Sequence, residues 1–553
     1  IAEADALIYQ HGKGFSPLQF HKKPIFYSPS YGRGSVERDF IGNAADASMP
    51  ANSTAEPHPR IYLPHSNFTI SRAAASAPSS GTSGSATYNV GVDWDNDGSF
   101  SVGDDDISGD VLEATWQAGG RDYASQLTGK GTAGWCTIKL KNYSGKYNSF
   151  NSLSPVFGKI VPGRPVQIKV LWSGVNYIMW RGFLDSIDPE PSLARLHHAT
   201  LRGSGPLAFI GQRKVNIPVA SAVKTGSAVS VILDEVGWST PDRSIDTGQT
   251  TMTVFFTGGK VDALTAIRKA EDTELGFVNE GKDGKIIFED RQHRSTDTRS
   301  TTSQYTVTDA SGGAIRYQDI KQADPLKEIF NIIEAKIQLY TAQSAATLWT
   351  LSESGSSSPS IAAGQSKTFW ASYPNPQSAS QATFVSSWTT PVSTTDYTAN
   401  SAADGSGSDL TSSISLAVTK FDTAMKIIVT NNHATVTAYL TLLQARGIPV
   451  YATDPVTVKS EDSSSQTAYG ERTWPLPGEF IPTTADGQSF TDYVLSIYKD
   501  PNPVVTMKFS GPRTSADMDF VLEARVSDRI TVTAVNRSDL GFNRDFYIEA
   551  MTH

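Results

Sequence analysis

The stretch that decides the fold lies within residues 88–187. It opens as YNVGVDWDNDGSFSVGDDDISGDV (88–111), continues as GTAGWCTIKLKNYSGKYNSFNSLSPVFGKIVPGRPVQIKVLW (131–172) and closes as MWRGFLDSI (179–187). Val90, Val92 and Trp94 alternate with other residues, which is the period of a half-buried strand. The alternation returns at residues 112–116, 136–140, 166–170, 183–187 and 198–201, between turns rich in Gly and Asn. Short antiparallel strands of this kind predict a small β-barrel or β-sandwich.

Bulk composition limits the classes of protein that the chain can belong to. Its 553 residues are too many for one core, and 39% hydrophobic with only 19% charged residues suits many short strands. The net charge of −9 disfavours tight binding of nucleic acid. A single cysteine, Cys136, permits no internal disulfide and fits assembly in a reducing cytoplasm. The sequence has no run of eighteen apolar residues, and residues 1–10 lack the pattern of a signal peptide.

Changes of period divide the chain into five expected units. They are an extended arm and linker (1–87), a β-barrel-like domain (88–203), an α+β domain (204–330), a β-sandwich-like insertion (331–450) and a mixed C-terminal domain (451–553). Within them we expect helices at 260–273 and 490–498, a hairpin turned at 282–284, and strands at 505–509, 520–524 and 529–534. The predicted fold class is multidomain and mainly β, with α+β parts.

The acidic loop after the first strand is a candidate calcium site. Oxygen ligands at positions 1, 3, 5, 7 and 12, with Gly98 at position 6, match a calcium-binding loop. The candidate ligands are Asp93, Asp95, Asp97, Ser99 and Asp104. No EF-hand helix precedes the loop, and Asp is shorter than the usual Glu at position 12. The other interpretation is a turn in which Asp and Asn bond their own backbone, with no cofactor at all.

Catalytic signatures are scarce in the sequence. HExxH, GxSxG and GxxxxGK[ST] do not occur, so we predict that the chain is not an enzyme. Paired carboxylates at Glu271 and Asp272 could serve acid–base chemistry, but the other side of their predicted helix is apolar. We therefore expect both residues on a solvated helix face.

The order of motifs resembles the N-terminal module of tail hub and minor tail proteins of tailed bacteriophages. The resemblance rests on DWDNDGSF (93–100), GWCTIKLKNYSGKY (134–147), NSLSPVFGKIVPGRPVQI (151–168) and WRGFLDSI (180–187). It covers residues 88–187 closely and residues 204–331 and 456–553 more loosely. It does not cover residues 1–87 or 350–450.

The resemblance implies a baseplate or tail-tip hub, assembled in the host bacterial cytoplasm and carried in the virion. Such proteins are usually homotrimers that form a ring at the distal end of the tail tube. They contact the tube or distal tail protein, the tape measure, and receptor-binding or fibre proteins, while DNA passes through the lumen. An arm with aromatic residues such as Phe15 and Phe26 would staple one subunit to the next. The alternatives are a hexameric distal tail ring, a cell-surface carbohydrate-binding adhesin and a tail-associated hydrolase.

Overall fold

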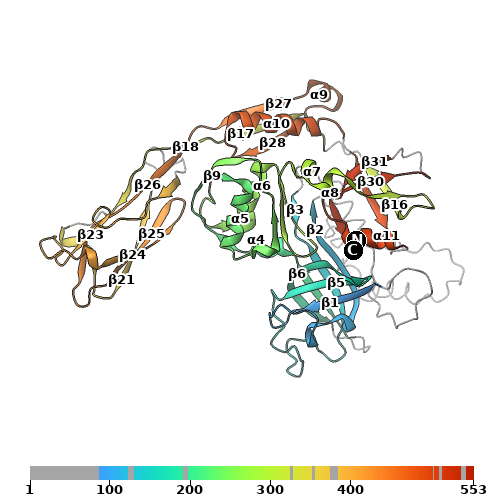
Figure 1. Cartoon of the computed structure of the whole chain (residues 1–553), viewed down its shortest axis with the longest axis horizontal. Coiled ribbons are helices and arrows are strands. Elements are labelled where there is room, and N and C mark those ends of the chain that lie inside the picture. Colours follow the sequence, from blue (N-terminus) through green and yellow to red (C-terminus); the bar gives the residue numbers. More distant parts are fainter. Residues whose placement is uncertain are drawn as a thin grey trace, which may run out of the picture.

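The computed structural model describes residues 86–121, 130–190, 197–323, 328–351, 355–373, 384–501, 503–509, 514–536 and 543–553. The arm expected over residues 1–87 lies outside the described residues, except for residues 86 and 87. Figure 1 shows an elongated molecule, with an N-terminal sheet at the bottom, a helical unit above it, a C-terminal unit at the right and a β-rich module at the far left. None of the helices in this part of the chain is both long and apolar enough to cross a membrane.

Residues 87–204 form most of an eight-stranded antiparallel sheet. Its strands are β1 (Thr87–Val92), β2 (Val111–Arg121), β3 (Gly131–Thr132), β4 (Trp135–Lys141), β5 (Pro165–Trp172), β6 (Val175–Glu190), β7 (His198–Ser204) and β32 (Ala550–Thr552), with 3-10 helices η1 (Gly103–Asp105) and η2 (Ser108–Asp110) between β1 and β2. The order β1-β5-β6-β7-β4-β2-β3, with β32 beside β2, does not close within the described residues, so the sheet is open rather than a closed barrel. Val90, Val92 and Trp94 are fully buried, which confirms the alternation in the sequence.

The next unit, residues 206–289, mixes helices with short strands. The elements are α4 (Pro206–Gly211), β8 (Lys214–Val215), β9 (Ala220–Lys224), α5 (Thr225–Glu235), η3 (Thr240–Asp242), β10 (Arg243–Ile245), β11 (Thr251–Phe255), β12 (Val261–Asp262), α6 (Ala263–Glu274), β13 (Phe277–Glu280) and β14 (Ile286–Glu289). Val229 and Ile232 of α5 share one core with Ile267 and Ala270 of α6. The predicted hairpin is confirmed, because β13 pairs antiparallel with β14.

The C-terminal unit combines two distant parts of the chain. After α7 (His293–Thr296) and α8 (Thr298–Thr301), it contains β15 (Ser303–Thr308), β16 (Ile315–Ala323), β29 (Val504–Phe509), α11 (Ser515–Glu523), β30 (Arg529–Thr533) and β31 (Asn543–Tyr547). The five strands form one sheet in the order β29-β16-β15-β30-β31. β15 and β16 pair with each other, and each also pairs with a strand from residues 504–547.

Helix α11 replaces the strand that we expected at residues 520–524. The prediction was wrong because α11 buries two faces at once. Met518 and Leu522, one helical turn apart, enter the core of the eight-stranded sheet. Phe520 and Ala524, also one turn apart, enter the core of the C-terminal unit. Two helical stripes offset by two residues produce the same alternation in sequence as one strand.

A small sheet with one helix packed on it connects these units. It contains β17 (Ile332–Ile337), β27 (Val456–Glu461) and β28 (Thr473–Gly478) in the order β27-β17-β28, with α9 (Ser463–Tyr469) after β27. Helix α10 (Thr484–Tyr498) covers the sheet and includes the predicted helix at 490–498. Phe490 and Val494 of α10 pack with Ile333 and Ile337 of β17 in one core.

The module at the left of Figure 1 consists of two facing sheets. One contains β18 (Tyr340–Ala342), β19 (Ala346–Thr350), β20 (Ser360–Ile361), β22 (Phe384–Trp388) and β23 (Tyr397–Asn400), all paired with the long β26 (Ala438–Ala452); the other contains β21 (Ser366–Ser372), β24 (Ile414–Lys420) and β25 (Ala424–Asn431). The short helices η5 (Gly355–Ser357) and η6 (Thr411–Ser413) lie in its loops. Ile427 of β25 and Leu440 of β26 belong to the core between the two sheets. The fold class, multidomain and mainly β with α+β parts, is confirmed.

Candidate assembly surface

The acidic loop after β1 is closed by its own carboxylate. Asp93 is buried, and its two carboxylate oxygens accept hydrogen bonds from the backbone N–H groups of Asp97 (3.0 Å) and Gly98 (2.8 Å). Gly98 has a φ of 88°, a left-handed conformation that glycine adopts without strain. Asp97 in turn accepts a hydrogen bond from the N–H of Ser99 (2.8 Å). These contacts are those of a turn stabilised by Asp side chains.

The structure brings three of the five predicted calcium ligands together. Carboxylate oxygens of Asp93, Asp95 and Asp97 lie within 4.8 Å of one another. The Asp104 carboxylate instead lies 3.7 Å from the ammonium of Lys146. An ion bound here would have to compete with Lys159, whose ammonium lies 3.4 Å from Asp95. Both oxygens of Asp93 are already engaged, so the loop holds its shape through these contacts, and calcium stays a hypothesis.

Burial and neighbouring acids both act on a carboxylate at the base of this loop. Asp105 is buried beneath it and accepts a hydrogen bond from the N–H of Trp94 (3.3 Å). Burial raises the pKa of Asp105, and the charges of Asp95, Asp93 and Asp97 raise it further, against the hydrogen bond from Trp94. The loop is therefore an acidic patch beside a buried indole.

Residues 142–157 form a second loop, which we call the turn ladder. Its backbone N–H groups bond the carbonyl three residues earlier at regular steps of three. The bonds run from Gly145 to Asn142 (3.1 Å), Asn148 to Gly145 (3.2 Å), Asn151 to Asn148 (3.0 Å), Ser154 to Asn151 (3.0 Å) and Phe157 to Ser154 (3.0 Å). Successive turns of this kind order a loop that has no helix or strand of its own.

Three Asn side chains reinforce the turn ladder. The side-chain oxygens of Asn142, Asn148 and Asn151 accept hydrogen bonds from the N–H groups of Tyr147, Phe150 and Leu153, at 3.0, 3.0 and 3.1 Å. Asn and Ser favour such local bonds, which explains their density here.

Two buried side chains anchor the ladder to the sheet. Tyr147 and Val156 are fully buried in the core of the eight-stranded sheet. The Tyr147 hydroxyl donates to Asp110 (2.7 Å), and burial together with this bond raises the pKa of Tyr147. The ladder is thus fixed to the sheet at Tyr147 and again near its C-terminal end.

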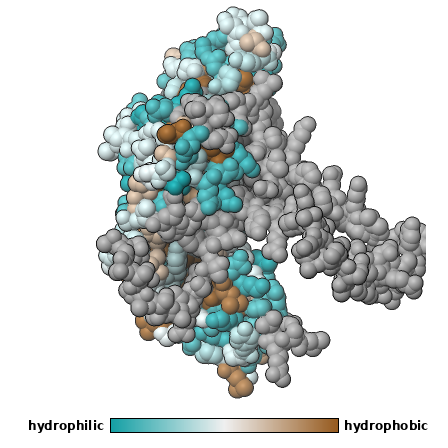
Figure 2. All heavy atoms as spheres, turned by 90° about the vertical axis from the view of Figure 1, so that its right-hand side faces the viewer, coloured by the Kyte–Doolittle hydropathy of each residue, from teal (hydrophilic) through white to brown (hydrophobic). Residues whose placement is uncertain are grey.

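The ladder holds large apolar side chains out into solvent. Phe150 is 91% exposed and Leu153 is 92% exposed. Tyr143, Phe157 and Val161, close by in the sequence, are also exposed, as is Val102 of the acidic loop. Figure 2 shows apolar residues at the lower end of the molecule, the end at which Figure 1 places the eight-stranded sheet.

Ion pairs join the two loops into one surface. The ammonium of Lys146, from the ladder, lies 3.7 Å from Asp104 and 3.6 Å from Asp110. Lys159, two residues after the ladder, pairs with Asp95 of the acidic loop. The surface therefore combines protruding apolar side chains with charges of both signs.

The expectation for Glu271 was wrong. This residue is buried, not solvated, and its carboxylate pairs with Arg268 (2.7 Å) and Lys130 (3.1 Å) and accepts the N–H of Val278 (2.7 Å). Asp272 is partly buried and also contacts Lys130. The charged residues on this side of α6 face β3 and β13 instead of water. Helical spacing in the sequence does not show which elements cover a helix face.

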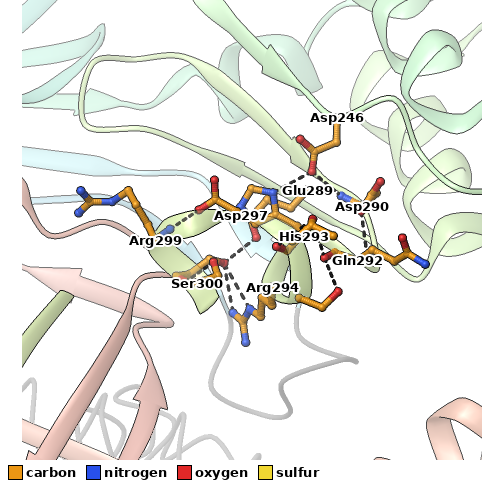
Figure 3. A network of polar contacts seen from close by, with 12 residues as sticks. Asp246, Glu289, Asp290, Gln292, His293, Arg294, Asp297, Arg299 and Ser300 are labelled. Atoms are coloured by element: carbon orange, nitrogen blue, oxygen red, sulfur yellow. Dashed lines mark hydrogen bonds and ion pairs between the residues drawn. The ribbon is translucent and has the colours of Figure 1, made fainter. Parts of the chain in front are cut away.

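A polar junction that the sequence did not predict lies around α7 and α8 (Figure 3). The His293 imidazole lies 2.8 Å from Asp246 and 3.8 Å from Glu289. Burial disfavours its charged form, but the bond to Asp246 and the charges of Glu289 and Asp246 outweigh burial, so the pKa of His293 is raised. Arg294 binds both oxygens of Glu549 (2.8 and 2.9 Å), and Arg299 binds Asp528 (2.7 Å). The junction thus ties the α+β unit to the C-terminal unit.

Comparison with known proteins gives no match to a protein-family model and none to a curated protein. Among solved structures, the chain is similar to the 43 kDa tail protein of prophage MuSo2 from Shewanella oneidensis, at 10% identity over 85% of this chain and 94% of that one, with a TM-score of 0.42. It is also similar to a tail protein from Neisseria meningitidis MC58 (9% identity, 84% and 91% covered, TM-score 0.43). A third is prophage tail protein gp18 from Listeria monocytogenes EGD-e (9% identity, 84% and 90% covered, TM-score 0.35). All three are tail proteins, the class that the sequence motifs resemble. Their TM-scores lie below 0.5, so the function of this chain has to be inferred from its own residues.

Proposed function

We propose that this protein is a structural subunit of a bacteriophage tail, a hub whose copies form a ring at the distal end of the tail tube. The turn ladder carries the proposal, because it is an ordered loop that presents Phe150 and Leu153 almost entirely to solvent. Exposed apolar side chains on a fixed backbone are typical of a surface that a partner covers. The ladder also coincides with the sequence motifs that resemble tail hub proteins.

The energetics favour an assembly contact. Full burial of a Phe or Leu side chain contributes about 1.5–3 kcal/mol, so the pair contributes several kcal/mol at each contact. The backbone bonds of the ladder exist before association, so little ordering entropy is lost on binding. In a ring each subunit would use this surface once, against a different surface of its neighbour.

In this proposal the ring is a homotrimer, and the hexameric ring is the alternative. The tube or distal tail protein and the tape measure would contact the ring, receptor-binding or fibre proteins would attach outside it, and DNA would pass through its lumen. The arm at residues 1–75 would reach the neighbouring subunit. The protein would act in the virion tail tip, without catalysis of its own.

A pair of substitutions tests the proposal. Phe150→Ser with Leu153→Ser removes the protruding apolar groups without touching the ladder bonds, which use backbone and Asn groups. We expect the purified protein to form a ring and the double variant to sediment as a monomer with an unchanged melting temperature. Val535→Ser is the matched control, because Val535 is also exposed (61%) but lies on the C-terminal unit.

Two results would contradict the proposal. One is a wild-type protein that stays monomeric at every concentration tested; the other is a double variant that assembles as well as the Val535→Ser control. The mass of the wild-type ring by analytical ultracentrifugation separates three copies from six. Deletion of residues 1–75 should weaken assembly while the monomer stays folded.

A further inference from the structure

The outer face of the β21–β25–β24 sheet carries one exposed tryptophan among Ser and Thr side chains, unlike the surfaces described above. The inner face packs into the module, with Met425, Ile427 and Val429 fully buried. Alternate residues point to the opposite face. We call this opposite face the platform; by the strand register it comprises Ser366, Thr368, Trp370 and Ser372 of β21, Ala424, Lys426, Ile428 and Thr430 of β25, and Ser415, Ala417 and Thr419 of β24.

Trp370 is the one large aromatic residue among these positions. It is 53% exposed on the edge strand, opposite Lys426 in the register. Its ring stacks on Phe421, with centroids 5.8 Å apart and planes inclined by 22°. Phe421 is itself fixed in the β24–β25 turn, since its N–H donates to the Ala424 carbonyl (2.8 Å) and its carbonyl accepts from the Trp388 indole (2.9 Å). The indole is thus backed by a rigid turn while much of its surface stays open.

Apart from Lys426, the polar groups of the platform are hydroxyls of Ser and Thr, and Ala417, Ala424 and Ile428 lie among them. All three strands contribute Ser or Thr, some of them already ordered by hydrogen bonds, as between Ser366 and Thr430 (2.8 Å). Lys426 supplies the platform's one charge, and none of the platform residues carries a carboxylate. A protein interface of this size would have a larger apolar centre, because Ser is depleted there and several aromatic or aliphatic anchors are usual.

We propose that the platform binds an oligosaccharide of neutral hexopyranose units. The apolar C–H face of a sugar ring would lie on the open face of the Trp370 indole, while its hydroxyls would bond the Ser, Thr and Lys426 side chains. The surface is rich in hydroxyls, with Lys426 as its one charged group and no carboxylate, so its hydrogen-bonding groups suit a neutral ligand that is itself rich in hydroxyls. The site is separate from the turn ladder, and in Figure 1 its module lies at the opposite end of the long axis from the C-terminal unit.

Titration of the full chain with three hexasaccharides tests the proposal. Cellohexaose, chitohexaose and maltohexaose share six-membered rings and differ in linkage and substituent. Binding is measured by calorimetry and by the change in tryptophan fluorescence. We expect at least one of them to bind, Trp370→Ala to weaken it roughly tenfold or more, and Trp370→Phe to weaken it less, because a smaller ring still stacks.

Controls separate this site from folding and from assembly. Val392→Ala changes another exposed residue (52%) of the same module that is not on the platform, and should leave binding unchanged. Lys426→Gln should weaken binding while the melting temperature stays that of the wild type. Phe150→Ser with Leu153→Ser should leave sugar binding intact, so failure of the ring proposal would not affect this one.

Several outcomes would overturn the inference. They are no binding of any hexasaccharide, binding that Trp370→Ala leaves unchanged, and loss of binding equally in Val392→Ala. Capture of a protein partner in a Trp370-dependent manner, without sugar binding, would make the platform a protein-docking surface instead.

Discussion

Glu280 joins the α+β unit to the eight-stranded sheet, and changing it tests how these two units are held together. It is fully buried at the end of β13 and accepts hydrogen bonds from the N–H of Gly134 and from the N–H of Leu207 (2.9 Å). Glycines surround it: a Cβ added at Gly205 would lie 1.8 Å from a Glu280 oxygen, and one added at Gly134 would lie 2.3 Å away. No cation contacts the carboxylate in the described residues, so its charge is balanced only by backbone dipoles.

The cost of ionising Glu280 follows from its pKa. Burial raises the pKa from 4.5 to about 7, against the two backbone hydrogen bonds, which lower it. A difference of about 2.5 units corresponds to about 3 kcal/mol. The folded state holds the proton more tightly than the unfolded state, so stability falls as pH rises from about 4.5 to about 7 and then levels off.

Glu280→Gln should remove this pH dependence. The variant has no charge to bury, although its amide must place one N–H donor against a backbone N–H, which costs about 1–3 kcal/mol at every pH. We therefore expect the stability of the variant, relative to wild type, to improve by about 3 kcal/mol between pH 4.5 and pH 8.

Hydrogen exchange gives a local measurement of this effect. The amides of Gly134 and Leu207 donate hydrogen bonds to the carboxylate, so the free energies at which these amides open to exchange report directly on the carboxylate. Unfolding of the other units does not affect these local values. Glu113→Gln, an exposed change on β2, is the control and should show no pH-dependent difference. A difference between Glu280→Gln and wild type that is constant from pH 4.5 to 8 would refute the assignment of a buried, uncompensated carboxylate.

Three further predictions concern the junction and the acidic loop. His293→Asn should destabilise the protein more at pH 5.5 than at pH 9, because a raised pKa gives stability below pH 6.5 that is lost as the imidazole deprotonates; equal destabilisation at both pH values would contradict this. Arg294→Met leaves the buried Glu549 short of its main partner and should cost about 3 kcal/mol in thermal or chemical unfolding, whereas a neutral result would show that the pair contributes nothing. The calcium hypothesis requires calcium to raise the melting temperature of the intact protein and not that of Asp95→Ala with Asp97→Ala; no rise in the intact protein leaves only a turn.

The sequence predicted elements that carry a clear local pattern. Strand alternation around Val90 and Val92, the β13–β14 hairpin and helix α6 all appear where this pattern placed them. The hairpin also has its partner close along the chain, whereas β1 pairs with the distant β5. The five-unit division itself stays a prediction, and the pairing of β15 with β30 runs across two of the expected units. Long-range pairing of this kind leaves no local trace in a single sequence.

The candidate sites likewise divide into those that a local motif predicts and those that depend on tertiary packing. The DWDNDG motif correctly indicated a turn of clustered acids, and the spacing of Asn142, Asn148 and Asn151 is a local signal for the turn ladder. By contrast, nothing local distinguishes the buried Glu271 from a solvated helix residue, since its burial comes from β3 and β13. Burial of a charge is decided by what packs above it, and that is tertiary information.

The eight-stranded sheet, which carries the proposed assembly surface, depends on residues far along the chain. Strand β32 pairs with β2, and Trp116 and His553 exchange backbone hydrogen bonds of 3.0 and 2.9 Å while their rings stack 5.7 Å apart. Burial lowers the pKa of His553 to about 3, so the imidazole is neutral at neutral pH. Met518 and Leu522 of α11 complete the same core. A chain synthesised only as far as residue 515 would therefore lack β32 and most of α11, which cover Trp116 and part of this core. The sheet that carries the proposed assembly surface is thus complete only after the C-terminal unit has been synthesised.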